Sequence, residues 1–184
     1  MLKFPQKLLI FTGAHGVGKT SLVGSVAECL RSSRRVAVIP EVARGLVDDG
    51  YAVNYRMNED GFIAYMTRYL KAVSSTSGEI ILSDRSLIDL RVYTKSFGAN
   101  HIRQGLHDLL AVLLEQEVAS GAEYVYVPIE FEMAIDGVRP DDLAYQRAID
   151  EEIRRLLVET GVRVLTVTGD LSARTEQVLA LYGH

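Results

Sequence analysis

The segment Gly13–Thr20 constrains this chain more than any other feature, and it reads Gly-Ala-His-Gly-Val-Gly-Lys-Thr. It matches G-x-x-x-x-G-K-[ST], the phosphate-binding loop pattern, at every fixed position. An apolar run at 8–11 precedes it, and apolar residues at helical spacing from Leu22 to Leu30 follow it. Loop N–H groups and the positive end of a helix dipole then converge on phosphate oxygens. We therefore expect this segment to bind a nucleoside triphosphate.

The pattern assigns a role to individual side chains of the loop. Lys19 would reach the β- and γ-phosphates, and the Thr20 hydroxyl would bind Mg²⁺. His15 occupies a variable position, where the backbone matters more than the ring. The predicted nucleotide-binding residues are Gly13, Ala14, His15, Gly16, Val17, Gly18, Lys19, Thr20 and Ser21.

Five short β-rich runs alternate with helical patterns along the chain. They lie at 7–12, 35–39, 79–83, 123–127 and 162–167. Most are continuously apolar, which is typical of strands covered on both faces in a parallel sheet. The alternation predicts a three-layer α/β/α fold with a five-stranded parallel sheet, whose ligands bind beyond the carboxyl ends of the strands.

Amphipathic stripes lie between these runs and predict the covering helices. We expect helices to bury the stripes at 62–73, 106–117 and 149–160. The middle stripe is carried by Leu106, Leu109, Leu113 and, in its last turn, Glu117. No repeat or linker divides the chain, so residues 1–184 are expected to form one domain.

Composition restricts the class of protein. Apolar residues make up 48% and the net charge is −4, so no overall basic field favours DNA, RNA or an anionic membrane. No apolar run approaches the ~20 residues of a membrane-spanning helix, and the N-terminus leads directly into the first strand, so a cytoplasmic location is expected. The single cysteine, Cys29, excludes an intramolecular disulfide and is expected to be a buried residue of the first helix.

Charged residues follow the second predicted strand in the segment Pro40–Arg44. Glu41 would project into the same crevice as the phosphate-binding loop, where it could accept a proton from an acceptor hydroxyl or help to place Mg²⁺. Arg44, one turn further, could meet an anionic group of a second substrate. The alternative is that Glu41 caps the next helix and pairs with Arg44 at the surface.

The third predicted strand ends in Ser83–Ser86. An acid after an apolar strand is typical of a Walker B site, in which Asp84 would hold Mg²⁺ directly or through water. Arg85 beside it would be a cation facing phosphate. The alternative for Asp84 is a helix cap. For Asp89, on the following helix, a local ion pair with Arg85 is favoured.

A glycine- and proline-flanked arginine, Arg139, lies between the fourth strand and a long helix. This setting suits a mobile lid, expected at 129–147, that would bring Arg139 onto the transferring phosphoryl group. Arg147 is left open between such a role and a surface ion pair. Arg174 in the last helix could lie near the nucleotide base, but no motif favours it.

Taken in order, these motifs resemble the nucleoside and nucleotide kinase branch of the P-loop proteins, which includes deoxynucleoside and thymidylate kinases. More closely, the chain is similar to a family of small AAA-domain kinase-like NTPases. That family includes relatives of the nicotinamide riboside kinase domain of the bacterial NAD regulator. The resemblance covers most of the chain and rests on Thr12–Thr20, Pro40–Arg44, Ser83–Ser86, Asp136–Arg139 and Gln146–Asp150.

The resemblance implies a strand order of 2-3-1-4-5 and transfer of the ATP γ-phosphoryl group to a small acceptor. In deoxynucleoside kinases the acid after the second strand takes the proton of the 5′-hydroxyl, and Glu41 stands at that position. Their E-R-S motif is similar to Asp84–Ser86, with Asp in place of Glu. No Trp is present to stack a nicotinamide or a nucleobase. The acceptor pocket, expected near the aromatic-rich segment 51–73, matches no substrate signature.

Two classes of function follow. The first is a kinase that acts on a nucleoside, nucleotide or ribosyl acceptor, with ATP as substrate and Mg²⁺ as cofactor. Its expected catalytic residues are Lys19, Glu41, Asp84, Arg85 and Arg139, its acceptor-binding residues Arg44 and Arg85, and its Mg²⁺ ligands Thr20 and Asp84. The alternative is a nucleotide-dependent switch or a plain ATPase acting with a protein partner. A homodimer is left open.

Overall fold

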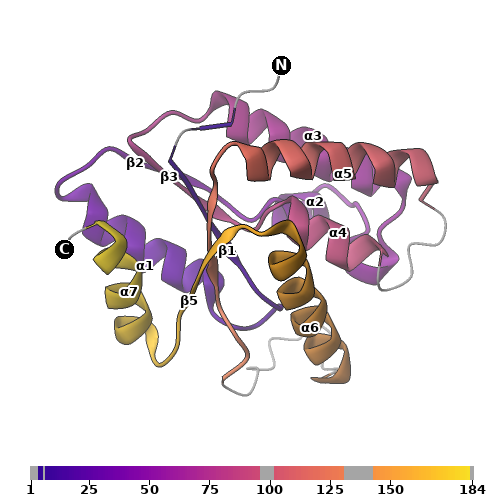
Figure 1. The fold of residues 1–184 in the computed structure, drawn as a ribbon. Helices are drawn as coiled ribbons and strands as arrows, with labels where there is room; N and C mark the ends of the chain where they lie inside the picture. The colour runs from indigo at the N-terminus through magenta and orange to yellow at the C-terminus, as the bar shows by residue number, and fades with distance from the viewer. Residues whose placement is uncertain (1–3, 6, 96–101, 131–142, 183–184) are drawn as a thin grey trace.

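A parallel five-stranded sheet forms the centre of the computed structural model, which describes residues 4–5, 7–95, 102–130 and 143–182 (Figure 1). The strand order is β2-β3-β1-β4-β5, as predicted. The strands are β1 (Leu8–Thr12), β2 (Val36–Ile39), β3 (Ile80–Asp84), β4 (Glu123–Tyr126) and β5 (Arg163–Thr166). All four pairings are parallel, so the carboxyl ends of β1, β2, β3 and β4 meet at one edge of the sheet.

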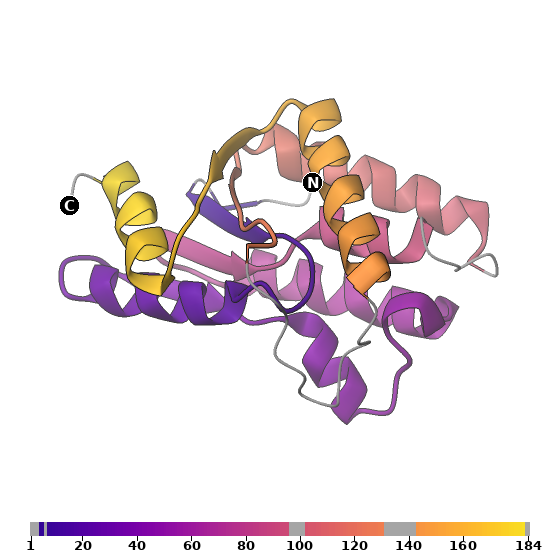
Figure 2. The same ribbon diagram turned by 90° about the horizontal axis from the view of Figure 1, so that it is seen from below.

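Helices cover both faces of the sheet, which makes three layers. On one face α1 and α7 lie side by side, as both Figure 1 and Figure 2 show. The other face is covered by α3 to α6, with the short α2 against α3. The helices are α1 (Lys19–Arg31), α2 (Val42–Asp48), α3 (Glu59–Ser75), α4 (Leu87–Lys95), α5 (Gln104–Ala119), α6 (Leu143–Thr160) and α7 (Leu171–Leu179), with 3₁₀ turns at Asn54–Arg56 and Ala180–Tyr182.

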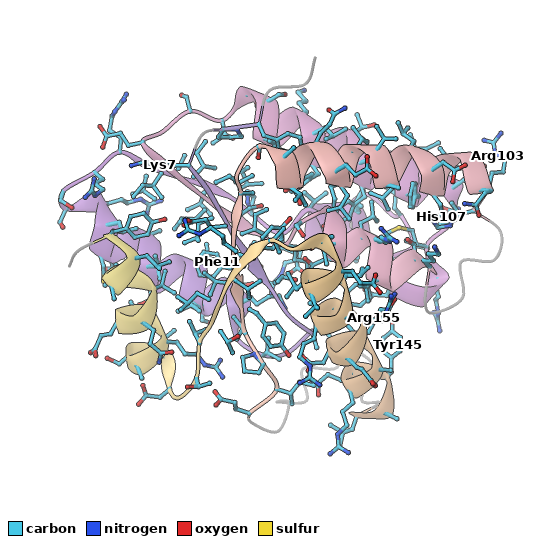
Figure 3. All side chains as sticks on the ribbon, viewed as in Figure 1. Lys7, Phe11, Arg103, His107, Tyr145 and Arg155 are labelled. Carbon is cyan, nitrogen blue, oxygen red and sulfur yellow. The ribbon has the colours of Figure 1, made fainter. Side chains whose placement is uncertain are left out.

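Two hydrophobic clusters, one on each face, hold these layers together. Phe11 of β1, labelled in Figure 3, belongs with α1 and α7, whereas Ile10 beside it belongs with α3 to α6. This is the alternation of a strand that is buried on both sides. Within the described part of the chain, no helix combines the length and the apolar character needed to cross a membrane.

The predicted burial of the strands is correct only for the middle of the sheet. Every residue of β1 and β3 is buried. The prediction is wrong for β5, where Leu165 is half-buried and the other three residues are exposed. Because β5 is an edge strand with a neighbour on one side only, its side chains are covered less completely than those of the central strands.

Two predictions about helix burial also need correction. In α5, Leu106 and Leu113 pack against the core and Glu117 is fully buried, as the predicted stripe requires, but Leu109 is exposed, and Leu110 and Leu114 are buried beside that stripe. Cys29 is exposed, because it lies at the margin of the buried stripe of α1 rather than within it.

Candidate active site

The phosphate-binding loop follows β1 and leads directly into α1. Gly13, Gly16 and Gly18 all have positive φ, at 144°, 78° and 88°. These values favour glycine because a side chain would be strained there. At Gly13 a Cβ would also lie 2.4 Å from the carbonyl oxygen of Val127, at the end of β4. The loop is therefore glycine-rich because its backbone adopts positive φ and because, at Gly13, the end of β4 leaves no room for a side chain.

Lys19, the first residue of α1, folds back over this loop. Its Nζ donates to the carbonyl oxygens of Gly13 at 2.9 Å and Ala14 at 2.5 Å. The side chain is buried, and burial together with the positive charge of Arg85 lowers the pKa of Lys19 to about 7. A cation held in this way lies where the loop would surround phosphate oxygens.

Thr20 and Asp84 form the contact between α1 and the end of β3. The Thr20 hydroxyl donates to Asp84 Oδ2 at 2.6 Å, while Oδ1 is buried and accepts no hydrogen bond from the described residues. A hydroxyl and a carboxylate oxygen are hard ligands that suit Mg²⁺, which commonly uses one or two protein ligands plus substrate phosphates. No cluster of three His, Cys, Asp or Glu side chains that could hold a metal alone occurs in the described residues.

Glu41, which follows β2, pairs with two arginines, Arg44 of α2 and Arg85 at the end of β3. Its Oε1 accepts from Arg85 Nε at 2.5 Å, and its Oε2 accepts from Arg44 Nε at 2.8 Å. Burial opposes the charged form, but the two arginines outweigh it and lower the pKa of Glu41 to about 2. The surface pair with Arg44 that the sequence offered as an alternative is thus present, together with an inward contact to Arg85.

Arg85 is held on several sides although its backbone is in the left-handed region, with φ at 87°. Its Nη1 donates to Asp89 Oδ1 at 3.1 Å, which is the local pair predicted from spacing. Its guanidinium also lies 5.2 Å from the centre of the Tyr93 ring. Asp89 in turn accepts from the hydroxyl of Thr12 at 3.1 Å and from the amide of Ser86 at 3.0 Å. These contacts fix the guanidinium at the carboxyl end of β3.

A cavity of about 140 Å³ brings the predicted residues together. Its lining comprises Gly16, Gly18, Lys19, Thr20, Ser21, Glu41, Arg44, Asp84 and Arg85. A groove of about 680 Å³ shares Thr20, Glu41, Arg44 and Asp84 with this cavity and continues along β2 between α1 and α3. The residues predicted to bind phosphate and Mg²⁺, together with Glu41, Arg44 and Arg85, therefore line one space.

The aromatic segment predicted to line an acceptor pocket divides into core and site. Phe62 and Tyr69 are fully buried among the helices. Tyr65 lines a small cavity of about 30 Å³ together with Glu41 and Arg85. Its buried hydroxyl has no hydrogen-bond partner among the described residues.

Other contacts to the loop were not expected from the sequence. Gln146 of α6 donates to the carbonyl oxygen of His15 at 2.7 Å, and the ring of Tyr145, labelled in Figure 3, lies 5.6 Å from the His15 ring. Arg174 of α7 donates to the carbonyl oxygen of Val17 at 2.9 Å. Gln146 was noted only as part of the family pattern, because nothing local indicates which backbone oxygen a distant side chain will meet.

Two arginines named in the sequence analysis, Arg139 and Arg147, remain to be considered. Arg139 and most of the predicted lid lie outside the described residues. Arg147 is exposed on α6 and does not line the cavity of about 140 Å³.

With this geometry established, comparison with known proteins places the chain. A family model described as an AAA domain matches residues 8–174, from β1 to Arg174 of α7. The chain belongs to this AAA-domain family. No curated protein matches the sequence.

Solved structures share the fold of this AAA domain. A NadR protein in complex with NR superposes with a TM-score of 0.73 at 20% identity, over 97% of this chain and 52% of that one. A NadR protein in complex with NAD and AMP-PNP has a TM-score of 0.68 at 17% identity, over 97% and 50%. A thymidylate kinase from Ehrlichia chaffeensis has a TM-score of 0.62 at 13% identity, over 97% and 99%. The chain thus spans about half the length of the NadR proteins.

Proposed function

We propose that this AAA domain transfers the γ-phosphoryl group of ATP to a small acceptor, a nucleoside, nucleotide or ribosyl compound. The observation that carries the proposal is the shared cavity. It is lined by Lys19 and Thr20 of the loop together with Glu41 and Arg85, which follow the neighbouring strands β2 and β3. A site built only to hold a triphosphate has no need of an acid and a buried arginine on the side facing the loop.

Each side chain has a role in this reaction. The loop amides and Lys19 would hold the phosphates and balance the charge that develops on the transferred group. Arg85 would bind the same group or an anionic acceptor. Glu41 is ionised above a pH of about 2, so it can accept a hydrogen bond from the acceptor hydroxyl and orient it toward the γ-phosphorus.

Thr20 and Asp84 would hold Mg²⁺, because the buried Oδ1 of Asp84 lacks a hydrogen-bond partner among the described residues and the Thr20 hydroxyl lies beside it. When bound, the ion would neutralise charge on the β- and γ-phosphates.

The structural relatives guide the choice of acceptors. NR is bound by one of the NadR proteins, and another relative is a thymidylate kinase. Sequence identities this low support a shared fold alone, so the acceptor has to be found by experiment. The panel should include nicotinamide riboside, the common nucleosides and deoxynucleosides, and their monophosphates.

The test is transfer of label from γ-³²P-labelled ATP with Mg²⁺ to each member of this panel. We expect one acceptor class to become phosphorylated, and hydrolysis without acceptor to be much slower. Lys19→Ala should abolish transfer, whereas Lys71→Ala, at an exposed position of α3, should not. Rapid hydrolysis that no acceptor changes would contradict the proposal and favour a plain ATPase. Tight nucleotide binding without transfer or hydrolysis would favour a switch.

A further inference from the structure

The fully buried carboxyl group of Glu117 lies in the last turn of α5, away from the cavity described above. Tyr69 of α3 donates to its Oε2 at 2.5 Å, and Tyr124 of β4 donates to its Oε1 at 2.6 Å. The backbone amide of Leu87, the first residue of α4, also interacts with it and favours its charged form. One carboxyl group therefore joins α3, α4, α5 and β4.

This carboxyl group is connected to the active-site turn. Leu87 follows Arg85 by two residues, and the side chain of Ser86, between them, interacts with the Tyr124 phenol. Ser86 also donates from its amide to Asp89, the partner of Arg85. Interactions thus connect Glu117, through Tyr124 and the start of α4, with the turn that carries Arg85, and α4 and α5 pack against each other.

The turn needs such support because its backbone is strained. Arg85 is a non-glycine residue with φ at 87°, a conformation that costs roughly 1–3 kcal/mol and persists only where the surroundings hold it. On its N-terminal side the turn is held by two hydrogen bonds, from the Arg85 amide to the carbonyl oxygen of Phe11 and from the Ser83 hydroxyl to that of Arg85. On its C-terminal side, Glu117 of α5 interacts with the amide of Leu87 and Tyr124 of β4 interacts with Ser86.

We propose that Glu117 is a positioning residue, whose buried carboxyl group holds the start of α4 and thereby keeps Arg85 in the orientation that the site requires. Only the expected change in kcat depends on the proposed phosphoryl transfer. The structural consequence, the order of the turn at Arg85, is independent of any reaction. A side chain that only filled space would not need to be a carboxyl group that accepts from the hydroxyls of α3 and β4.

Two tyrosine variants separate positioning from general stability. Tyr69→Phe and Tyr124→Phe each remove one hydrogen bond to Glu117, but only Tyr124 also interacts with Ser86. We expect Tyr124→Phe to loosen the turn and Tyr69→Phe to leave it ordered. Glu117→Leu should loosen it most, and Glu117→Gln, which keeps an acceptor oxygen, should largely rescue it. Glu115→Leu, at an exposed position of α5, is the matched control.

The first measurement is amide hydrogen exchange of the intact chain without ligand, followed in a peptide covering 84–90 and in one from β1. In Glu117→Leu and Tyr124→Phe, exchange at 84–90 should rise at least tenfold relative to the β1 peptide. In the other three variants the rise should be below threefold. An equal rise in both peptides, or the same result for the two tyrosine variants, would overturn the proposal.

The second measurement is the kinetics of transfer to the acceptor found with the panel. For Glu117→Leu and Tyr124→Phe, kcat should fall at least tenfold while the KM for ATP changes less than threefold, because the phosphate-binding loop is untouched. An unchanged kcat in both variants would also overturn the proposal. If no acceptor is phosphorylated but exchange changes as expected, the proposed function fails and the positioning role of Glu117 stands.

Discussion

Glu117→Gln should change how the free energy of unfolding depends on pH. Burial raises the pKa of the Glu117 carboxyl group from 4.5 to about 7, in spite of the two tyrosine hydroxyls that donate to it. The unfolded chain loses this proton near pH 4.5 and the folded chain near pH 7. Stability from this group is therefore complete below pH 4.5 and is lost as the pH rises toward 7.

The size of the effect follows from the two pKa values. Each pKa unit corresponds to about 1.4 kcal/mol, so ionisation of Glu117 costs the folded state about 3 kcal/mol above pH 7. Most of this cost, about 2 to 3 kcal/mol, arises between pH 5 and pH 8. The amide that replaces the carboxyl group does not titrate, so the variant should gain that amount relative to the natural chain over the same interval, whatever their difference at pH 5.

Urea unfolding of both proteins at pH 5, 6, 7 and 8 measures this difference directly. Subtracting the two free energies removes the titration of all other groups that the substitution leaves unchanged. The control is Glu115→Gln on the exposed side of α5, for which the difference should vary by less than about 0.5 kcal/mol. A Glu117→Gln difference that stays constant within that margin would show that the carboxyl group is not buried as described, and would refute the reasoning.

Three further substitutions test the site. Gly13→Ala should destabilise the fold by more than about 3 kcal/mol in thermal unfolding, because the new Cβ would lie 2.4 Å from the carbonyl oxygen of Val127. The control is Gly24→Ala, which should be neutral or stabilising because the space around Gly24 is open. Asp84→Asn should weaken Mg²⁺-dependent ATP binding at least tenfold by calorimetry while leaving binding without Mg²⁺ nearly unchanged. Glu41→Gln should lower kcat of transfer at least tenfold. The same variant should also lose less stability than the natural chain as the pH falls from 4.5 toward 2, because the arginines depress the pKa of Glu41 in the folded state.

The alternation of strands and helices could be predicted because burial on two faces and helical spacing are local patterns. The boundaries of β1 and β3 agree with the predicted runs within a residue. The errors arose where burial depends on neighbours rather than on the pattern. The edge strand β5 contains apolar residues, and Leu109 of α5 is the same residue type as Leu110, yet Val164 and Leu109 are exposed because no neighbouring element in the described part of the chain covers them.

The sequence predicted that Glu41 and Arg85 lie at the same edge of the sheet, but not that they form an ion pair. The sequence separation of 44 residues contains no information on distance, and the surface alternative with Arg44 was equally compatible with the spacing. Glu117 shows more clearly that a sequence pattern does not predict contacts between distant elements. It was noted as the polar end of an apolar stripe, and nothing local indicated that two tyrosines from other elements would surround it.

The sequence by itself determined the phosphate-binding loop, the strand and helix that flank it, and the charged residues that follow the second and third strands. Such features depend on steric limits and hydrogen bonds between residues close along the chain, as at Gly13, Gly16 and Gly18. Only the tertiary structure decided which charges far apart along the chain meet, that Arg85 adopts a left-handed backbone conformation, and that the carboxyl group of Glu117 is buried. Those outcomes depend on how distant segments pack, because burial and the approach of opposite charges set the energy of an ionisable group.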